Sequence, residues 1–276
     1  MKFTDILELL KKIWRPIYRN RRPIKRFVRK VRVSRVSQSA LNSSQIECFR
    51  KIGLDWPEAR SGVENLIGKN IDISSHRSEH YELLFAISKT YSPKKILEIG
   101  TAEGDFTVFL AGLFPNAIIE TIDLPNSDQR FWNATVTSDQ KLTTKNLQNE
   151  VDKRNSKISD FSNISFQEAN SLALTFQESE KYDLIWVDGD HTYPIVGIDI
   201  ANSLRLLRHG GILGLDDIYT TPQKNYQWVG QESYETLVAF RNAGLIEFDL
   251  ILKKLFPEKN YDKKSQKFIA VAKRLV

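Results

Sequence analysis

The stretch that decides the fold is KILEIGTAEGD, residues 95–105. Its first half, Ile96–Ile99, is mostly apolar and predicts a buried parallel strand. Gly100 and Gly104 then end the strand, and apolar residues recur at helical spacing in the residues that follow. Such a strand, glycine turn and helix form a cradle, because glycine lets the backbone approach a ligand and a helix N-terminus presents free N–H groups. We therefore expect a cofactor to bind here, with Glu98 facing it from the end of the strand.

The glycine spacing separates this motif from the standard dinucleotide fingerprint. The turn has two glycines, whereas Gly-x-Gly-x-x-Gly needs three. A glutamate two residues before the first glycine instead resembles the first motif of class I S-adenosylmethionine (SAM)-dependent methyltransferases. That resemblance implies that Glu98 lies near the methionine amino group, and that the turn of Gly100, Thr101 and Gly104 passes beneath the cofactor. The ordinary alternative is any strand-turn-helix of an α/β domain.

Composition limits the class of protein. A chain of 276 residues suits one large α/β domain with an extension, or two small domains. The single cysteine, Cys48, excludes an intrachain disulfide and a Cys-rich metal site, and fits a reducing compartment. No apolar run reaches the roughly 18 residues that span a bilayer, and the N-terminus lacks the features of a secretory signal. We therefore expect a cytoplasmic protein.

Positive charge is concentrated in residues 1–36. They hold 13 Lys or Arg and two acids, hence a charge of +11, which leaves −5 for the rest of a chain whose formal charge is +6. Apolar residues recur at helical spacing before Pro16 and again after Pro23. Two short basic amphipathic helices fit a peripheral anchor on an anionic membrane, on the inner face. They also fit packing on a partner or a second copy, a solvated tail, or a clamp on RNA phosphates. Nucleic acid is disfavoured because the remaining chain is negative.

The rest of the chain divides into an adaptor and a sheet domain. Residues 37–75 are expected to hold the end of a Ser- and Asn-rich linker over 34–44 and then a helical adaptor. Residues 76–276 alternate apolar strands with amphipathic helices. This pattern predicts an α/β fold with a seven-stranded, mostly parallel sheet and helices on both faces. The last two strands, near 248–252 and 268–272, are expected to form a hairpin.

Acidic residues stand at the carboxyl ends of four predicted strands. They are Glu98, Asp123, Asp188, Asp216 and Asp217. Parallel α/β sheets bind ligands at this edge, and Asp123 follows the glycine turn at close to the spacing of about 20 residues expected for an acid that binds ribose. Acids gathered at one edge repel one another unless a cation lies among them. The sulfonium and ammonium of a cofactor, with a hard divalent ion, would supply that positive charge.

The order of these acids narrows the resemblance. In this chain the order is Asp188-Gly189-Asp190-His191, a predicted helix, two glycines, a predicted strand and Asp216-Asp217. One branch of the class I methyltransferases has a similar order of motifs. That branch includes metal-dependent O-methyltransferases of macrolide sugars. The resemblance covers residues 76–276 and implies a Rossmann-like fold.

The resemblance also implies roles for individual residues. It implies magnesium ligands at Asp188, Asp216 and Asp217, and a general base at His191. After the third strand, Asn170 stands where the family usually has an Asp that contacts adenine, so this contact is weakened or made by Ser171. A magnesium ion would stabilise the charge that develops on the acceptor oxygen, while a histidine takes the proton.

These observations lead to one function and two rivals. We expect a SAM-dependent, Mg²⁺-dependent O-methyltransferase that acts on a hydroxyl of a sugar, glycan or glycolipid, the acceptor class being implied by the resemblance alone. The rivals are an RNA methyltransferase that uses the basic N-terminus, and a non-catalytic protein with a degenerate SAM fold bound to a membrane or partner. The sequence is also compatible with a homo-oligomer.

Overall fold

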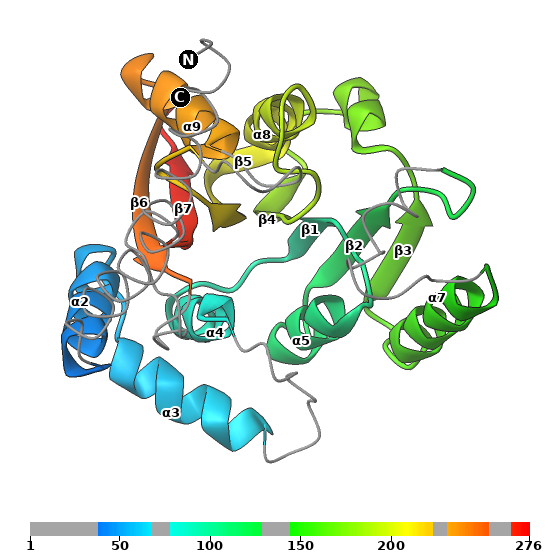
Figure 1. The fold of residues 1–276 in the computed structure, drawn as a ribbon, viewed down its shortest axis with the longest axis horizontal. Helices are drawn as coiled ribbons and strands as arrows, with labels where there is room; N and C mark the ends of the chain where they lie inside the picture. Colours follow the sequence, from blue (N-terminus) through cyan, green and yellow to red (C-terminus); the bar gives the residue numbers. More distant parts are fainter. Residues whose placement is uncertain (1–37, 68–77, 129–143, 223–230, 254–265) are drawn as a thin grey trace, which may run out of the picture.

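The computed structural model describes residues 38–67, 78–128, 144–222, 231–253 and 266–276 (Figure 1). The basic extension predicted over residues 1–36 lies outside this part of the chain.

Seven strands form a single sheet. They are β1 (Lys95–Ile99), β2 (Ile118–Asp123), β3 (Ile164–Glu168), β4 (Tyr182–Val187), β5 (Leu207–Ile218), β6 (Ile246–Leu252) and β7 (Phe268–Arg274). Their order in the sheet is β3-β2-β1-β4-β5-β7-β6. Neighbours pair in parallel, except that β7 runs antiparallel to both β5 and β6. The predicted seven-stranded, mostly parallel sheet with its terminal hairpin is therefore confirmed.

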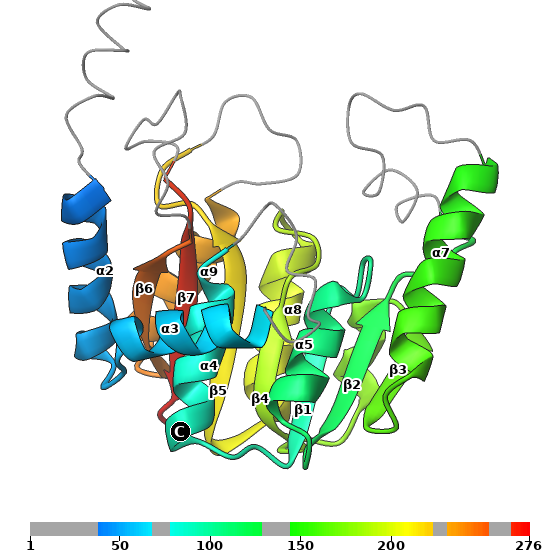
Figure 2. The ribbon, with the colours of Figure 1, turned by 90° about the horizontal axis from the view of Figure 1, so that it is seen from below.

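Helices cover both faces of the sheet. They are α2 (Gln38–Lys51), α3 (Trp56–Ile67), α4 (His80–Thr90), α5 (Asp105–Leu113), α7 (Thr144–Ser159), α8 (Ile195–Leu206) and α9 (Glu232–Asn242), with a 3-10 helix, η1 (Ser171–Phe176), after β3. Helices α4 and α5 lie on one face, and α8 and α9 on the other (Figures 1 and 2). Each face has its own apolar core, as the prediction of helices on both faces requires.

Alternation along β1 divides its side chains between the two cores. Ile96 packs with the helices of one face, whereas Leu97 and Ile99 pack with those of the other, because successive residues of a strand point to opposite sides. The chain order reverses between β1 and β4. Parallel α/β sheets bind ligands at such a switch point, beyond the carboxyl ends of the strands. The topology therefore places the ends of β1 and β4 on either side of the expected ligand site.

The linker predicted over residues 34–44 is wrong from Gln38 onward, where α2 begins. The Ser- and Asn-rich composition led to the prediction of a linker. The helix nevertheless has an apolar face, because Leu41 and Phe49 recur at helical spacing and are both buried against the sheet. Tertiary packing, rather than intrinsic propensity, stabilises this helix. The residues that follow form the rest of α2 and then α3, which ends at Ile67, whereas residues 68–75 of the predicted adaptor lie outside the described residues.

A buried glutamine joins α2 to the edge strand β6. Gln45 Nε2 donates to the Leu252 carbonyl at 3.1 Å, and the Leu252 N–H donates to Gln45 Oε1 at 3.0 Å. The Gln45 side chain is fully buried. The Gln45 side-chain amide thus pairs with the backbone of the edge strand β6 as a neighbouring strand would, and without it these backbone groups would be unpaired. Leu252 is the last residue of β6, so this contact also fixes the residue that follows the strand.

We predict that Gln45→Ala lowers the free energy of unfolding by about 2–6 kcal/mol, because it leaves a buried N–H and a buried C=O unpaired at roughly 1–3 kcal/mol each. Urea denaturation followed by circular dichroism measures the change. Ser44→Ala is the matched control: Ser44 is exposed on the same helix, and its substitution should change stability by no more than about 0.5 kcal/mol. Equal effects of the two substitutions would contradict the role given to Gln45.

Candidate active site

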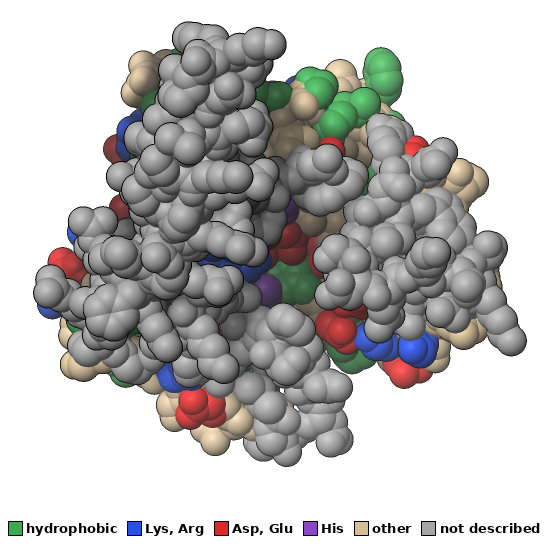
Figure 3. Space-filling model, viewed as in Figure 1, with side chains coloured by type: hydrophobic (Ala, Val, Ile, Leu, Met, Phe, Trp, Pro, Cys, Tyr) green, Lys and Arg blue, Asp and Glu red, His purple; other side chains and the backbone are tan. Residues whose placement is uncertain are grey.

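The acids predicted from the sequence all lie at the carboxyl edge of the sheet. Glu98 is near the end of β1, Asp123 ends β2, Asp188 follows β4, and β5 carries Asp216 and Asp217. In the space-filling view, acidic, basic and histidine side chains gather in a hollow near the middle of this face (Figure 3). The prediction that these strand ends share one edge is therefore confirmed by the topology.

The glycine turn after β1 packs directly against the segment that follows β4. Gly100 has a φ of +102°, and a side-chain carbon added to it would lie 2.3 Å from the backbone oxygen of Asp188. Gly104, with a φ of +78°, precedes the first turn of α5. Only glycine adopts such backbone angles at little cost. The missing side chain of Gly100 thus makes room for protein backbone, and the turn is held in place by the loop that carries Asp188.

Glu98 lies beneath this turn and is fully buried. Its Oε2 accepts hydrogen bonds from the hydroxyls of Thr107 and Thr121, each at 2.5 Å, and Thr101 Oγ1 lies 2.6 Å from Thr121 Oγ1. Within the described residues, Glu98 Oε1 has no hydrogen-bond partner. Burial raises the pKa of Glu98 to about 8, and the two hydroxyls offset only part of that effect. An ammonium group of a ligand would fit this buried, unpartnered oxygen.

Asp123 caps the glycine turn from the end of β2. Its Oδ2 accepts the N–H of Ala102 at 2.7 Å, and its Oδ1 accepts the N–H of Leu124 at 2.8 Å. Burial raises the pKa of Asp123, although these donors and the nearby Arg154 guanidinium oppose the rise. Each carboxylate oxygen can accept a further hydrogen bond. Asp123 therefore remains able to accept from ribose hydroxyls, the role predicted for it.

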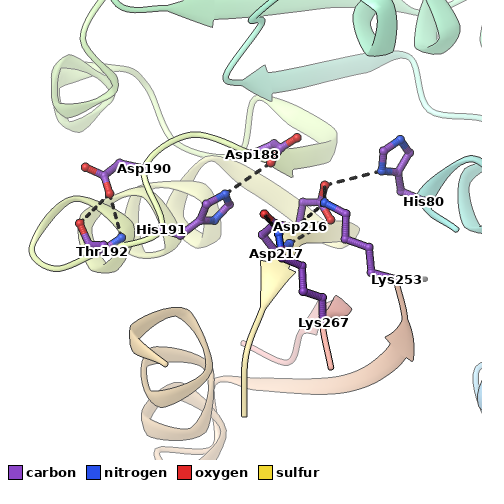
Figure 4. A network of polar contacts seen from close by, with 9 residues as sticks. All are labelled: His80, Asp188, Asp190, His191, Thr192, Asp216, Asp217, Lys253 and Lys267. Carbon is purple, nitrogen blue, oxygen red and sulfur yellow. Dashed lines mark hydrogen bonds and ion pairs between the residues drawn. The ribbon is translucent and has the colours of Figure 1, made fainter. Parts of the chain in front are cut away.

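Two lysines lie among the acids of β5 (Figure 4). Lys253 Nζ is 2.6 Å from Asp216 Oδ2 and also pairs with Asp217 Oδ1, while Lys267 Nζ is 2.6 Å from Asp217 Oδ2. Burial would raise the pKa of both aspartates, but the Lys253 ammonium outweighs it, so the pKa of each is lowered. Burial likewise opposes the charged form of Lys253, but Asp216 and Asp217 prevail and raise the pKa of this lysine.

His191 lies beside Asp188. Its Nε2 is 3.5 Å from Asp188 Oδ1, and its side chain is 11% exposed. Burial disfavours the imidazolium, but the Asp188 carboxylate outweighs burial and raises the pKa of His191. The neighbouring Asp190 accepts the N–H of Thr192 at 2.8 Å and its hydroxyl at 2.7 Å. Asp190 therefore caps a local turn, whereas His191 is the residue of this motif that reaches the acids.

Residues 97–218 match the family model described as a methyltransferase domain. This region is a methyltransferase domain, and the sheet that contains it has the Rossmann-like methyltransferase fold. Among solved structures, a proposed O-methyltransferase from Klebsiella pneumoniae is similar in fold, with a TM-score of 0.51 at 16% identity over 87% of this chain and 99% of that one. No curated protein matches the chain significantly.

Two further solved structures are similar to this methyltransferase at a lower score. An O-methyltransferase from Bacillus cereus, in complex with SAH, has a TM-score of 0.47 at 14% identity over 86% of this chain and 99% of that one. The O-methyltransferase TomG from Streptomyces achromogenes, in complex with SAM, has a TM-score of 0.45 at 16% identity over 87% and 99%. At such identities, these likenesses add nothing about the residues of this site.

The residues predicted to contact adenine lie after β3, at the start of η1. Asn170 Oδ1 accepts the N–H of Leu172 at 3.0 Å and so caps η1. Ser171 lies beside the buried carboxylate of Asp199, whose pKa burial raises to about 6. The side-chain oxygen of Asn170 is therefore engaged within the methyltransferase itself, and the adenine contact of either residue stays a prediction.

The magnesium ligands predicted at Asp188, Asp216 and Asp217 do not fit a metal ion as they stand. The two lysines already engage both oxygens of Asp217 and one of Asp216. Within the described part of the chain, no group of three or more His, Cys, Asp or Glu side chains is placed to hold a metal. A magnesium ion requires an octahedron of oxygens at about 2.0–2.1 Å, which these ammonium groups obstruct. The prediction of magnesium therefore gains no support from the arrangement of the site.

Three site residues were missed by the sequence interpretation. Lys253 and Lys267 belong to the hairpin of β6 and β7, and His80 begins α4, with Nδ1 3.6 Å from Asp216 Oδ2. A signal for Lys253 was available. Because β6 is antiparallel to β7, which is antiparallel to β5, the carboxyl ends of β5 and β6 share one edge. A lysine directly after the predicted strand should therefore have been placed beside Asp216 and Asp217.

The pKa of Glu98 generates a prediction for stability. A carboxyl whose pKa is raised in the fold contributes stability that is full below its ordinary pKa of 4.5 and is lost as the pH rises through about 8. Glu98→Gln mimics the neutral form at every pH. We expect the cofactor-free variant to gain stability relative to the wild type between pH 5 and pH 8, by up to about 1.4 kcal/mol per pH unit. Urea denaturation of both proteins at pH 5, 6.5 and 8 measures this gain. If the stability of the wild type and of the variant changed with pH in the same way, Glu98 would be charged in the folded protein and the prediction would be wrong.

Proposed function

We propose that this protein is an O-methyltransferase that transfers the methyl group of SAM to a hydroxyl of a sugar, glycan or glycolipid. The observation that carries the proposal is a buried histidine, His191, held against Asp188 at the edge where the glycine turn also ends. A base at this position beside a SAM cradle suits an acceptor that must lose a proton. The choice of a sugar-type acceptor follows from the resemblance to macrolide-sugar O-methyltransferases.

The residues present suit the cofactor. Glu98 offers a buried, unpartnered oxygen to an ammonium group, Asp123 offers acceptors to ribose, and Gly100 and Gly104 supply the positive-φ backbone of the turn between them. When bound, SAM supplies a methyl group on a positively charged sulfur, which an oxygen nucleophile can attack. The chain contributes orientation and the exclusion of water, because Thr101 and Glu98 at the base of the turn are buried.

His191 acts as the general base. An alcohol is a weak nucleophile until its proton leaves, and the Nε2 of His191 faces the acids rather than solvent. Because Nε2 directs its N–H at the Asp188 carboxylate, the hydroxyl proton goes to the other ring nitrogen, and the resulting imidazolium forms a full ion pair with Asp188, which stabilises the charged product of that step. The same pairing is the cause of the raised pKa of His191.

Magnesium, which the resemblance implied, has no part in this proposal, because Lys253 and Lys267 hold the oxygens that the ion would need. Among the described residues of this edge, the acids at the strand ends outnumber the lysines that pair with them, so RNA methylation is not favoured. Residues 1–36 keep the role proposed from their sequence, peripheral attachment to an anionic membrane. No helix in the described residues is long and apolar enough to cross a membrane.

The acceptor is found by incubating the purified protein and radiolabelled SAM with fractions of a cell extract. With the fraction that takes up label, His191→Ala should lose turnover by about 10²–10⁴-fold, the usual contribution of a general base. Its affinity for S-adenosylhomocysteine (SAH), measured by calorimetry, should remain that of the wild type.

Asp190→Asn is the matched control, since Asp190 lies one residue away and is exposed. It should turn over the same fraction at close to the wild-type rate. Near-normal turnover by His191→Ala, together with loss in Asp190→Asn, would move the base to Asp190. If the radiolabelled methyl group were found in nucleic acid rather than in a sugar or lipid fraction, the proposed acceptor class would be wrong.

A further inference from the structure

The Lys253 ammonium occupies the position among the acids where a divalent cation was predicted. It bridges two consecutive carboxylates of β5, at 2.6 Å from Asp216 Oδ2 and in contact with Asp217 Oδ1. Its side chain is 12% exposed and that of Asp216 is 1% exposed. A charge pair this deeply buried stays only where each partner compensates the other. The pair is therefore a built part of the site rather than a contact at the surface.

The backbone holds Lys253 in this position from two sides. Its N–H donates to the carbonyl of Lys267 at 3.0 Å, and its carbonyl accepts the N–H of Glu79 at 2.9 Å. Through these two bonds Lys253 is fixed to the residues that directly precede β7 and α4. The preceding residue, Leu252, is held in turn by Gln45 of α2. Lys253 thus stands at a junction of four elements, and its ammonium group is aimed from a rigid base.

Lys267 completes the charge balance and differs from Lys253 in its contacts. Its Nζ pairs with Asp217 Oδ2 at 2.6 Å, and its side chain is 29% exposed. Three carboxylates, those of Asp188, Asp216 and Asp217, thus face two ammonium groups. Adding a divalent ion while both lysines stay would make this cluster net positive beside a cofactor that is itself a cation. The electrostatics therefore favour either the lysines or a metal, and not both.

We propose that Lys253 is the resident cation of this active site, in the place of a divalent metal, and that methyl transfer in this protein needs no bound metal ion. This inference rests on the proposed function. An ammonium group has three N–H donors, and two are used by Asp216 and Asp217. The third is available to the acceptor oxygen, where it stabilises the negative charge that develops as His191 takes the proton.

Binding of Mn²⁺, followed by the fall of its free electron paramagnetic resonance signal, tests the inference without an acceptor. The full-length protein is saturated with SAH in each titration. The wild type should leave the free Mn²⁺ signal unchanged, because its carboxylates are engaged. Lys253→Met should bind one Mn²⁺, at least about tenfold more tightly than the wild type, since removal of a buried ammonium frees the carboxylates. Lys267→Met, the matched control, should gain less, because Asp216 remains paired with Lys253.

Two results of the Mn²⁺ titrations would overturn the inference. One is a tightly bound Mn²⁺ in the wild type, and the other is the absence of binding in both the wild type and Lys253→Met. An equal gain in Lys267→Met would overturn the assignment to Lys253. Circular dichroism and SAH calorimetry show whether each variant is folded, and Lys253→Gln replaces the Met variant if that one does not fold. The wild-type titration needs no variant.

Failure of the inference is distinct from failure of the proposed function. If no extract fraction accepts label from SAM, the proposed function fails whatever the Mn²⁺ titration shows. If a fraction does accept label, wild-type turnover should survive EDTA unchanged. Turnover that stops in EDTA and returns with Mg²⁺ would overturn the inference and leave the methyltransferase assignment in place.

Discussion

The close packing of Gly100 against the Asp188 carbonyl is the contact on which the site depends. Gly100 directly follows β1 and begins the glycine turn, and Asp188 directly follows β4 and begins the segment that carries His191. A side-chain carbon on residue 100 would lie 2.3 Å from that carbonyl, so the two loops can meet only if the residue is glycine. They meet at the switch point between β1 and β4. One glycine therefore sets the distance between the turn after β1 and the segment that carries His191.

Charge is the second constraint on this edge of the sheet. Parallel strands bring their carboxyl ends together, and here each of four strand ends contributes an acid. Two lysines compensate part of that repulsion. Because β7 is antiparallel to both β5 and β6, the hairpin of β6 and β7 places Lys253 and Lys267 at the same edge. Burial keeps Glu98 neutral by raising its pKa to about 8. The remaining negative charge suits a cationic cofactor.

Much of this arrangement could be predicted from the sequence, because the informative features are local. The apolar run before Gly100 and the acids at later strand ends predict the sheet, its ligand edge and the place of His191. The prediction of a linker around residues 34–44 was wrong because the side chains that stabilise α2 pack against β6, about 200 residues away in the sequence. Lys253 was missed for a related reason: its partners become visible only once the register of the hairpin is considered.

Binding of SAH to the wild type and to Gly100→Ala, measured by calorimetry, tests the central claim most directly. The wild type should bind one SAH, and Gly100→Ala should bind at least about tenfold more weakly, equivalent to 1.4 kcal/mol, because the added carbon separates the turn from the Asp188 loop. Gly210→Ala is the control: Gly210 also has a positive φ, but its added carbon would meet no atom within 4 Å, so SAH affinity should not change. Wild-type affinity in a folded Gly100→Ala variant would contradict the account.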